Sequence, residues 1–247
     1  MLKKLLKITL PILHIIRKIL VILKKNIVPP PAPLTSVIAL YEKEETIKCY
    51  EYFKPYFKSS VLIETAEIRE YAIKKSLEND KNKNLYNLEF GVYVGTSINF
   101  FSKYVNKIYG FDSFEGLKED WVGYYMPKGT FNLNKKIPKL NNNVTPVVGW
   151  VQDTLDIFLE TNKPEINFVH VDVDTYESTK FILEKIKPYL VQNSIILFDE
   201  LYNFPGWDVG EHKALMETFE KDEFQYLAFS TTDQQVVIKI TKKDNQK

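Results

Sequence analysis

Residues 166–174 read INFVHVDVD, an almost unbroken apolar run that ends in two aspartates. Runs of this kind are typical of a strand that is buried on both faces of a parallel sheet. Residues 177–190 follow with apolar positions at helical spacing, as expected of the crossover helix that joins two parallel strands. The stretch therefore predicts an α/β domain whose ligands bind where the strand ends.

The same alternation of strand and helix extends along the chain in both directions. Residues 36–79 have a helical pattern that includes a second helix at 64–77, and further helices are predicted at 97–105 and 211–220. The other predicted strands are residues 87–92, 107–111, 144–148, 194–198, 224–229 and 236–240. Such alternation predicts a doubly wound, mostly parallel sheet, here with seven strands.

The last two predicted strands are joined by the short polar turn STTDQ at 230–234, which is a hairpin signal. A terminal hairpin places one antiparallel strand in the sheet. This Rossmann-like arrangement is that of class I methyltransferases, whereas the sheet of a dehydrogenase is all parallel.

Composition and charge exclude several classes of protein. The 247 residues include one cysteine, Cys49, and three histidines, so an internal disulfide and a closed thiolate zinc site are excluded. The first 33 residues hold seven basic residues and no acid, which leaves 26 basic against 32 acidic residues in the rest. The rest of the chain is acidic, and the whole chain has two arginines, Arg17 in the arm and Arg69 in the body, which argues against nucleic-acid binding. The cytoplasm is the expected compartment.

The chain begins with a basic, apolar arm, MLKKLLKITLPILHIIRKILVILKK at 1–25, followed by the stiff linker PPPAP at 29–33. Its apolar runs are too short to span a bilayer. Two interpretations stay open: an amphipathic helix on an anionic membrane surface, or a helix that packs on the body or on a second subunit. We therefore divide the chain into the arm and linker at 1–33, a helical segment at 34–80 and the main domain at 81–247.

A glycine-containing turn follows the strand at 87–92, within EFGVYVGTS at 89–97. Glycines let a ligand approach the backbone, and the helix start offers free N–H groups. Asp112 lies 17 residues after Gly95, at the end of the next strand, where it can accept hydrogen bonds from ribose hydroxyls. Together these features predict a nucleoside cofactor, although Asp112 could instead cap a turn, and NAD-binding folds share the spacing.

Four carboxylates are expected to converge at the mouth of the sheet. Asp172 and Asp174 are two apart and so face the same side, and Asp199 and Glu200 end the next strand. A hard divalent cation, magnesium or else manganese or calcium, would relieve their repulsion; the alternative is that some of them cap helices. His170 is either a base or a buried core residue. The aromatic-rich stretch at 117–143 is either a lid or a surface excursion.

Several of these motifs occur together in one order. They are LEFGVYVG at 88–95, GFDSFEGL at 110–117, GWVQDTL at 149–155, HVDVDTYEST at 170–179, FDE at 198–200, PGW at 205–207 and EHKA at 211–214. In this respect the chain resembles the macrocin-type sugar O-methyltransferases over roughly residues 60–240. The arm and linker lie outside the resemblance.

The resemblance implies S-adenosylmethionine as methyl donor and a Mg²⁺ ion. Asp172, Asp199 and Glu200 match the metal-binding acids of the family, which commonly has aspartate at the last position, and Asp174 matches the proposed general base. Matches to the donor site are Glu89, Gly91 and Asp112, and Asp153 falls in the segment expected near adenine. The full set of candidate donor-binding residues is Glu89, Gly91, Gly95, Thr96, Ser97, Asp112, Ser113 and Asp153.

The sequence therefore predicts a Mg²⁺-dependent O-methyltransferase that acts on a hydroxyl of a sugar or glycan. A lipid-linked acceptor, peripheral contact with the inner face of the membrane through residues 1–25, and a homo-oligomer are further expectations that stay open. An NAD-linked oxidoreductase would leave the clustered acids unexplained. The rival from another class is a non-catalytic, membrane-docked binding protein that retains the fold.

Overall fold

The computed structural model describes residues 36–82, 84–123 and 126–241, and an eight-stranded sheet lies at its centre. The strand order is β1-β7-β8-β6-β5-β2-β3-β4, and β8 runs antiparallel to both of its neighbours while every other pair is parallel. The strands are β1 Val61–Ile63, β2 Tyr86–Phe90, β3 Ile108–Asp112, β4 Val144–Val148, β5 Ile166–Val171, β6 Leu190–Phe198, β7 Phe224–Ser230 and β8 Val236–Ile240. The predicted α/β class and its C-terminal hairpin are confirmed.

The sheet has one strand more than the sequence predicted. The additional strand β1 has three residues and pairs with β7 at the edge of the sheet, with Val61 opposite Ala228. Val61 and Leu62 are 48% and 55% exposed, so the strand carries no apolar alternation that could reveal it. Long-range pairing with β7 therefore makes this strand, rather than a local pattern.

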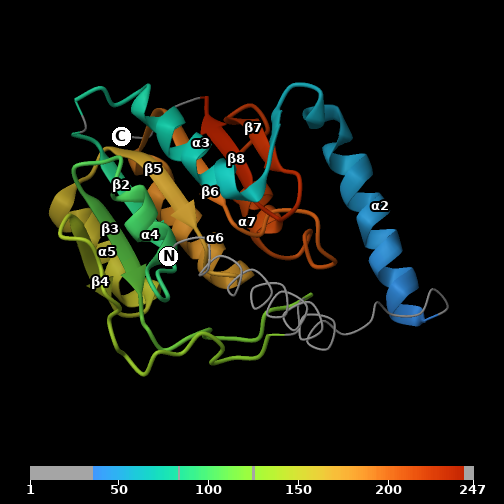
Figure 1. Cartoon of the computed structure of the whole chain (residues 1–247), viewed down its shortest axis with the longest axis horizontal. Helices are drawn as coiled ribbons and strands as arrows, with labels where there is room; N and C mark the ends of the chain where they lie inside the picture. Colours follow the sequence, from blue (N-terminus) through green and yellow to red (C-terminus); the bar gives the residue numbers. More distant parts are fainter. Residues whose placement is uncertain (1–35, 83, 124–125, 242–247) are drawn as a thin grey trace, which may run out of the picture. The chain divides into compact units, whose positions relative to one another are not determined.

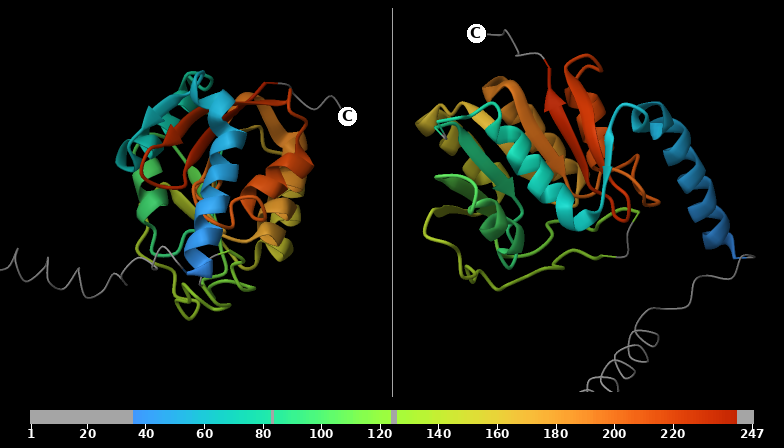
Figure 2. Two further views of the ribbon diagram at one scale, coloured as in Figure 1. Left: turned by 90° about the vertical axis from the view of Figure 1, so that its right-hand side faces the viewer. Right: turned by 45° about the horizontal axis from the view of Figure 1, so that its top comes forward.

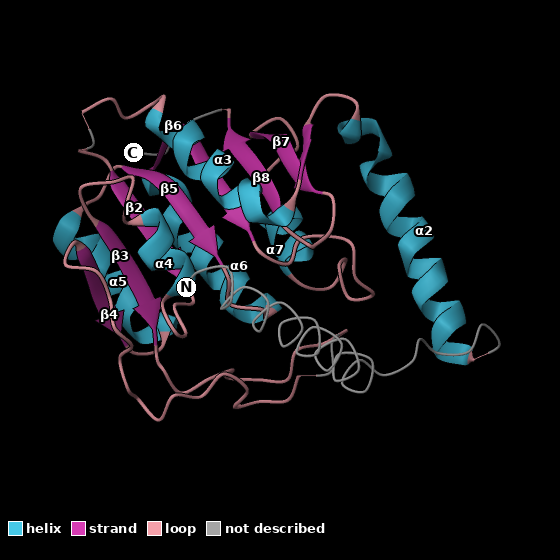
Figure 3. Ribbon diagram, in the orientation of Figure 1, coloured by secondary structure: helices cyan, strands magenta, loops and turns pink. Residues whose placement is uncertain are grey.

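Helices cover both faces of the sheet. The elements α3 Thr65–Leu77 and α4 Thr96–Phe101 lie on one face, in front in Figure 1, and contribute Ile68, Ile73 and Phe101 to one core cluster. The elements α5 Val151–Asn162, α6 Tyr176–Ile186 and α7 Glu211–Thr218 lie on the other face with the second cluster. A short 3₁₀ turn, Lys187–Tyr189, links α6 to β6. Figure 3 distinguishes the helices, in cyan, from the strands of the sheet, in magenta. The sequence did not predict α5.

The central strand β5 is buried as predicted. All six residues of β5 are buried, as are four of the five residues of β2 beside it. Burial on both faces follows from the helices that cover the sheet on each side. The centre of the sheet is thus rigid, and the residues that follow these strands are held on a fixed edge.

The helix α2, Val37–Phe57, precedes β1. Its Phe53 is fully buried against Tyr226 and Phe229 of β7, and Figure 2 shows the helix from two further sides. The described residues from 42 to 241 form one compact unit, so the part of the helical segment from residue 42 onward shares the core of the main domain.

The predicted arm at residues 1–33 lies outside the described residues, and so does its predicted membrane contact. Within the residues that are described, no helix combines the length and the hydropathy needed to cross a bilayer.

Candidate functional site

The register of the central strands brings the predicted site residues to one edge of the sheet. Phe90 of β2 lies opposite both Phe111 of β3 and Val171 of β5, and Val171 lies opposite Phe198 of β6. The residues that follow these ends are therefore neighbours in space, because parallel strands finish at the same edge. They include Gly91, Asp172 and Asp199.

A cavity of about 320 Å³ opens at this edge. Seven of the predicted site residues line it: Gly91, Asp112, Ser113, Asp172, Asp174, Asp199 and Glu200. Five do not, namely Glu89, Gly95, Thr96, Ser97 and Asp153. The cavity thus joins the predicted donor turn to the predicted acids.

The turn after β2 requires its first glycine. Gly91 has φ +87°, and a Cβ placed there would lie 1.7 Å from the carbonyl oxygen of Asp172. Gly95 also has a positive φ, +82°, and directly precedes α4. Only glycine allows this close approach of two backbones beside the cavity.

Asp112 holds the same turn. Its Oδ2 accepts hydrogen bonds from the N–H groups of Val92 at 2.8 Å and Tyr93 at 2.7 Å, and its Oδ1 accepts one from Phe114 at 2.6 Å. A carboxylate has about four acceptor positions, so about one is left for a ligand. The turn-capping alternative is therefore realised, and ribose binding by the remaining position stays a prediction.

Glu89 and Ser97 do not line the cavity but form hydrogen bonds behind the turn. Glu89 is fully buried, and its carboxylate accepts hydrogen bonds from Ser97 Oγ at 3.0 Å and from His170 Nδ1 at 3.1 Å. Burial raises the pKa of Glu89, while the bonds from His170 and Ser97 act in the opposite direction. Glu89 thus links the start of α4 to the C-terminal end of β5.

The start of α5 forms another wall of the cavity. Trp150, Val151 and Gln152 line it, whereas Asp153, the residue predicted near adenine, is exposed. Lys118 donates a hydrogen bond to Gln152 at 3.3 Å and lies 5.5 Å from the centre of the Trp150 ring. The predicted segment therefore lies at the cavity, but the residues that line it are those just before Asp153 and not Asp153 itself.

Three of the predicted acids form a tight group. Carboxylate oxygens of Asp172, Asp174 and Glu200 lie within 4.8 Å of one another. Burial and the neighbouring carboxylates raise the pKa values of all three, that of Asp174 to about 7. Asp174 also has a left-handed backbone, φ +61°, an uncommon conformation that clusters at functional sites.

Glu211, the first residue of α7, lies beside this group. Its Oε2 accepts a hydrogen bond from the Glu200 N–H at 3.0 Å, whereas its Oε1 and the Oε2 of Glu200 are buried without a hydrogen-bond partner. Burial raises the pKa of Glu211 most, and the charges of the neighbouring acids raise it further. Buried carboxylate oxygens without partners are costly, so they fit a hard divalent cation.

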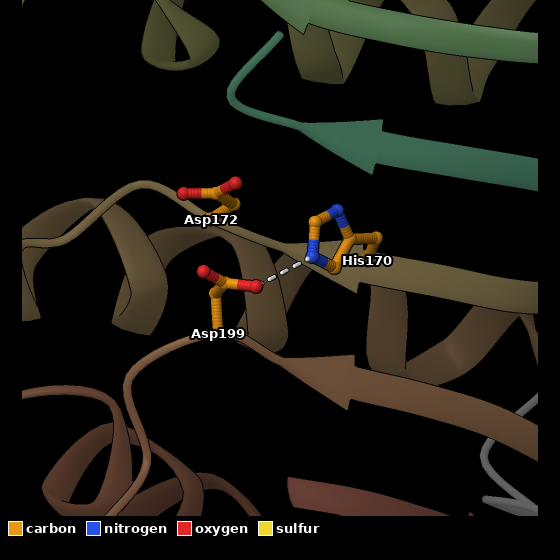
Figure 4. A group of neighbouring side chains, drawn as sticks. All are labelled: His170, Asp172 and Asp199. Atoms are coloured by element: carbon orange, nitrogen blue, oxygen red, sulfur yellow. Dashed lines mark hydrogen bonds and ion pairs between the residues drawn. The ribbon is translucent and has the colours of Figure 1, made fainter. Parts of the chain in front are cut away.

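Asp199 has a different environment from the other acids. Its Oδ1 accepts hydrogen bonds from Arg69 Nη2 at 3.0 Å, from His170 Nε2 at 3.3 Å and from the Gln235 side chain. Figure 4 shows the bond between His170 and Asp199. Burial would raise the pKa of Asp199, but the bond to His170 and the charges of His170 and Arg69 hold it well below its usual range. Asp199 is therefore ionised.

His170 is a buried link and not a cavity-lining base. Burial alone would lower its pKa, but the hydrogen bonds to Asp199 and Glu89 raise it to about 10. His170, Asp172 and Asp199 also approach within 4.8 Å, but both ring nitrogens of His170 already face carboxylates. A cation would accordingly be held by the carboxylates and not by this imidazole.

The aromatic-rich stretch forms one side of the cavity. Its backbone folds back on itself through the bridge between Trp121 and Met126, and Trp121 and Phe131 line the cavity. Phe131 lies 5.3 Å from the ring of Tyr93 in the donor turn. The stretch therefore contributes to the cavity wall, and its role as a lid stays a prediction.

Several residues of the site were missed by sequence reasoning. They are Arg69, Trp150, Gln152, Glu211 and Gln235. The near absence of arginine was a signal for Arg69, because a lone arginine in the acidic body is conspicuous. Nothing local distinguishes Gln235, which reaches the site only through the pairing of β8 with β6.

Comparison with known proteins agrees with this geometry. Residues 88–201 match the family model described as a methyltransferase domain. The structure is similar to that of CalS11, a calicheamicin methyltransferase, with a TM-score of 0.58 and 22% identity over 85% of this chain and 87% of that one. The fold is that of a class I methyltransferase.

Two further solved structures share the fold. The apo form of CalS11, described as a TDP-rhamnose 3'-O-methyltransferase, has a TM-score of 0.51 and 21% identity over 85% of this chain and 87% of that one. The O-methyltransferase NovP has a TM-score of 0.53 and 18% identity over 71% of this chain and 79% of that one. No curated protein matches the chain. The matched methyltransferase domain supports the predicted methyltransferase activity, and these neighbours share its fold.

Proposed function

We propose that this protein is an S-adenosylmethionine-dependent and Mg²⁺-dependent O-methyltransferase of the macrocin type, which acts on a hydroxyl of a sugar or glycan. The observation that carries the proposal is the cavity in which the Gly91 turn meets four acids, of which Asp174 and Glu200 are buried and Asp172 and Asp199 half-buried. A donor turn alone would fit other nucleoside-binding enzymes, and an acid cluster alone would fit other metal sites. Their meeting in one cavity favours metal-assisted methyl transfer.

The donor half of the site is assigned to the turn after β2 and to the start of α5. S-adenosylmethionine supplies an activated methyl group when it is bound. Gly91 leaves room beside the Asp172 backbone, the remaining acceptor position of Asp112 suits a ribose hydroxyl, and Trp150 and Gln152 suit an adenine ring. Glu89, Gly95, Thr96 and Ser97 then shape the turn from behind, and Ser113 and Asp153 remain proposed donor contacts.

The acceptor half is assigned to the acids. Asp172, Asp199 and Glu200 would hold Mg²⁺, which supplies Lewis-acid activation of a hydroxyl. Asp174 is the proposed catalytic base: it faces the same cavity, and a pKa of about 7 suits a group that must accept a proton near neutral pH. Trp121 and Phe131 give the acceptor an aromatic wall and help to exclude water.

The proposed acceptor is a sugar because adjacent sugar hydroxyls can bind one cation together, and because CalS11 is described as a sugar methyltransferase. We extend the proposal to a lipid-linked or envelope glycan, because the basic arm at residues 1–25 is suited to an anionic membrane. Full-length protein should then sediment with anionic liposomes, and a variant that lacks residues 1–33 should not. Equal sedimentation would favour the alternative of arm packing in a homo-oligomer, which sedimentation velocity would detect.

The first test is calorimetric titration of S-adenosylhomocysteine into the folded protein, with Mg²⁺ and with EDTA. We expect saturable binding, followed by Mg²⁺-dependent methylation in a panel of sugar acceptors. Asp174→Asn should lose turnover and keep S-adenosylhomocysteine binding. Absence of binding under both conditions would remove the donor assignment and favour a non-catalytic, membrane-docked binding protein with this fold.

A further inference from the structure

Asp199 is held more firmly than any other acid of the cluster in the described part of the chain. Three donors, from Arg69, His170 and Gln235, converge on its Oδ1. They come from three separate places in the fold, which are α3, β5 and the residue before β8. Donors from three directions fix both the position and the rotation of a carboxylate.

Two of these donors are themselves buried. His170 is fully buried and Gln235 is 1% exposed. His170 is held at its other nitrogen by Glu89, which is bonded to Ser97 at the start of α4. Figure 4 shows that the second oxygen of Asp199 points away from the imidazole.

We propose that Arg69, His170 and Gln235 are positioning residues that occupy Oδ1 of Asp199 and leave Oδ2 as its single metal-ligating oxygen. The inference rests on the proposed function, because it concerns the cation that the acids are proposed to hold. Residues that orient a ligand from behind commonly set metal affinity without touching the metal. Asp172 and Glu200 would then supply the adaptable part of the ligand set around one fixed oxygen, and Asp174 stays free as the proposed base.

Gln235 offers the cleanest test, because its amide is uncharged. Removal of Arg69 would also remove a positive charge near the cation, and this electrostatic change would oppose the loss of positioning. Gln235→Met removes the amide donor and keeps the length of the side chain. Gln234→Met is the matched control: it is the same substitution at the adjacent residue, where the backbone makes the hydrogen bonds, with Leu201, Tyr202 and Asp233.

The experiment measures Mn²⁺ binding to the full-length proteins by electron paramagnetic resonance of free Mn²⁺, and S-adenosylhomocysteine binding by calorimetry. We expect Gln235→Met to weaken Mn²⁺ binding by about 10- to 100-fold, while S-adenosylhomocysteine binding stays at the wild-type level. Gln234→Met should bind both ligands as the wild type does. If Gln235→Met does not fold, Gln235→Asn, which withdraws the amide by one carbon, should show the same loss of Mn²⁺ affinity.

The outcomes separate this role from the proposed function. Equal Mn²⁺ affinity in the wild type and the folded Gln235 variants would overturn the positioning role and leave the metal site intact. Absence of Mn²⁺ binding in the wild type would remove the metal from the proposed function and the positioning role with it. A parallel loss of Mn²⁺ and S-adenosylhomocysteine binding in both folded Gln235 variants would show a general structural role and would also overturn the proposal.

Discussion

Neutralising two adjacent acids, Asp199 and Glu200, should have opposite effects on the stability of the metal-free protein. Asp199 is paired with Arg69 and His170, so Asp199→Asn leaves the fully buried His170 and the half-buried Arg69 with less compensation. Glu200 lies among like charges, and its Oε2 has no hydrogen-bond partner. Glu200→Gln therefore removes repulsion rather than attraction.

The magnitudes follow from the geometry. Breaking a buried ion pair from one side costs about 3–5 kcal/mol, which corresponds to a fall in Tm of roughly 6–20 °C for a domain of this size. Two carboxylates at the 4.8 Å limit of the cluster repel by about 3.5 kcal/mol at an effective dielectric constant of about 20. Partial protonation relieves part of this repulsion, so we expect Glu200→Gln to raise stability by about 1–3 kcal/mol.

The assay is thermal unfolding in EDTA, followed by circular dichroism, with S-adenosylhomocysteine binding as the control for a native fold. The pKa of Glu200 is raised in the folded state, so the folded protein binds the additional proton and loses stability as pH rises. The advantage of Glu200→Gln should accordingly grow between pH 5 and pH 9. A Glu200→Gln variant that melts as early as Asp199→Asn would refute this account of the cluster.

Two further predictions concern the donor turn and the thiol. Gly91→Ala should abolish S-adenosylhomocysteine binding in calorimetry, because the added Cβ would overlap the Asp172 carbonyl. The control Gly129→Ala, at a similar positive φ but with nothing within 4 Å, should bind normally. Equal binding by the two variants would contradict the proposed role of Gly91 in the donor site. Burial raises the pKa of the Cys49 thiol to about 11, so little thiolate exists at pH 8, and Ellman's reagent should label Cys49 only after unfolding. Rapid labelling of the native protein would show that α2 separates readily from the core.

Much of the fold could be predicted because its central strands have recognisable local sequence patterns. The apolar run of β5 and the polar turn between β7 and β8 reflect burial on both faces and a short antiparallel connection, and both are visible in a few residues. The edge strand β1 was missed for the opposite reason, since two of its three residues are exposed and its pairing partner lies more than 160 residues away.

The candidate site, like the fold, was predicted in part. Acids at strand ends could be expected to meet, because parallel strands place their carboxyl ends together. Their individual environments could not be predicted, because Arg69 and Gln235 reach Asp199 from distant parts of the chain. The sequence also did not show that the Asp112 carboxylate holds the backbone of its neighbouring turn.

The sequence by itself determined which chemistry is present at which strand end: a glycine turn after β2, an acid after β3 and pairs of acids after β5 and β6. These follow from local patterns of burial and from the alternation of strand and helix. Only the tertiary structure decided that Asp199 is ionised and clamped while Asp172, Asp174 and Glu200 share uncompensated charge. The physical reason is that pKa and orientation depend on which groups lie within a few ångströms, and long-range packing alone sets those neighbours.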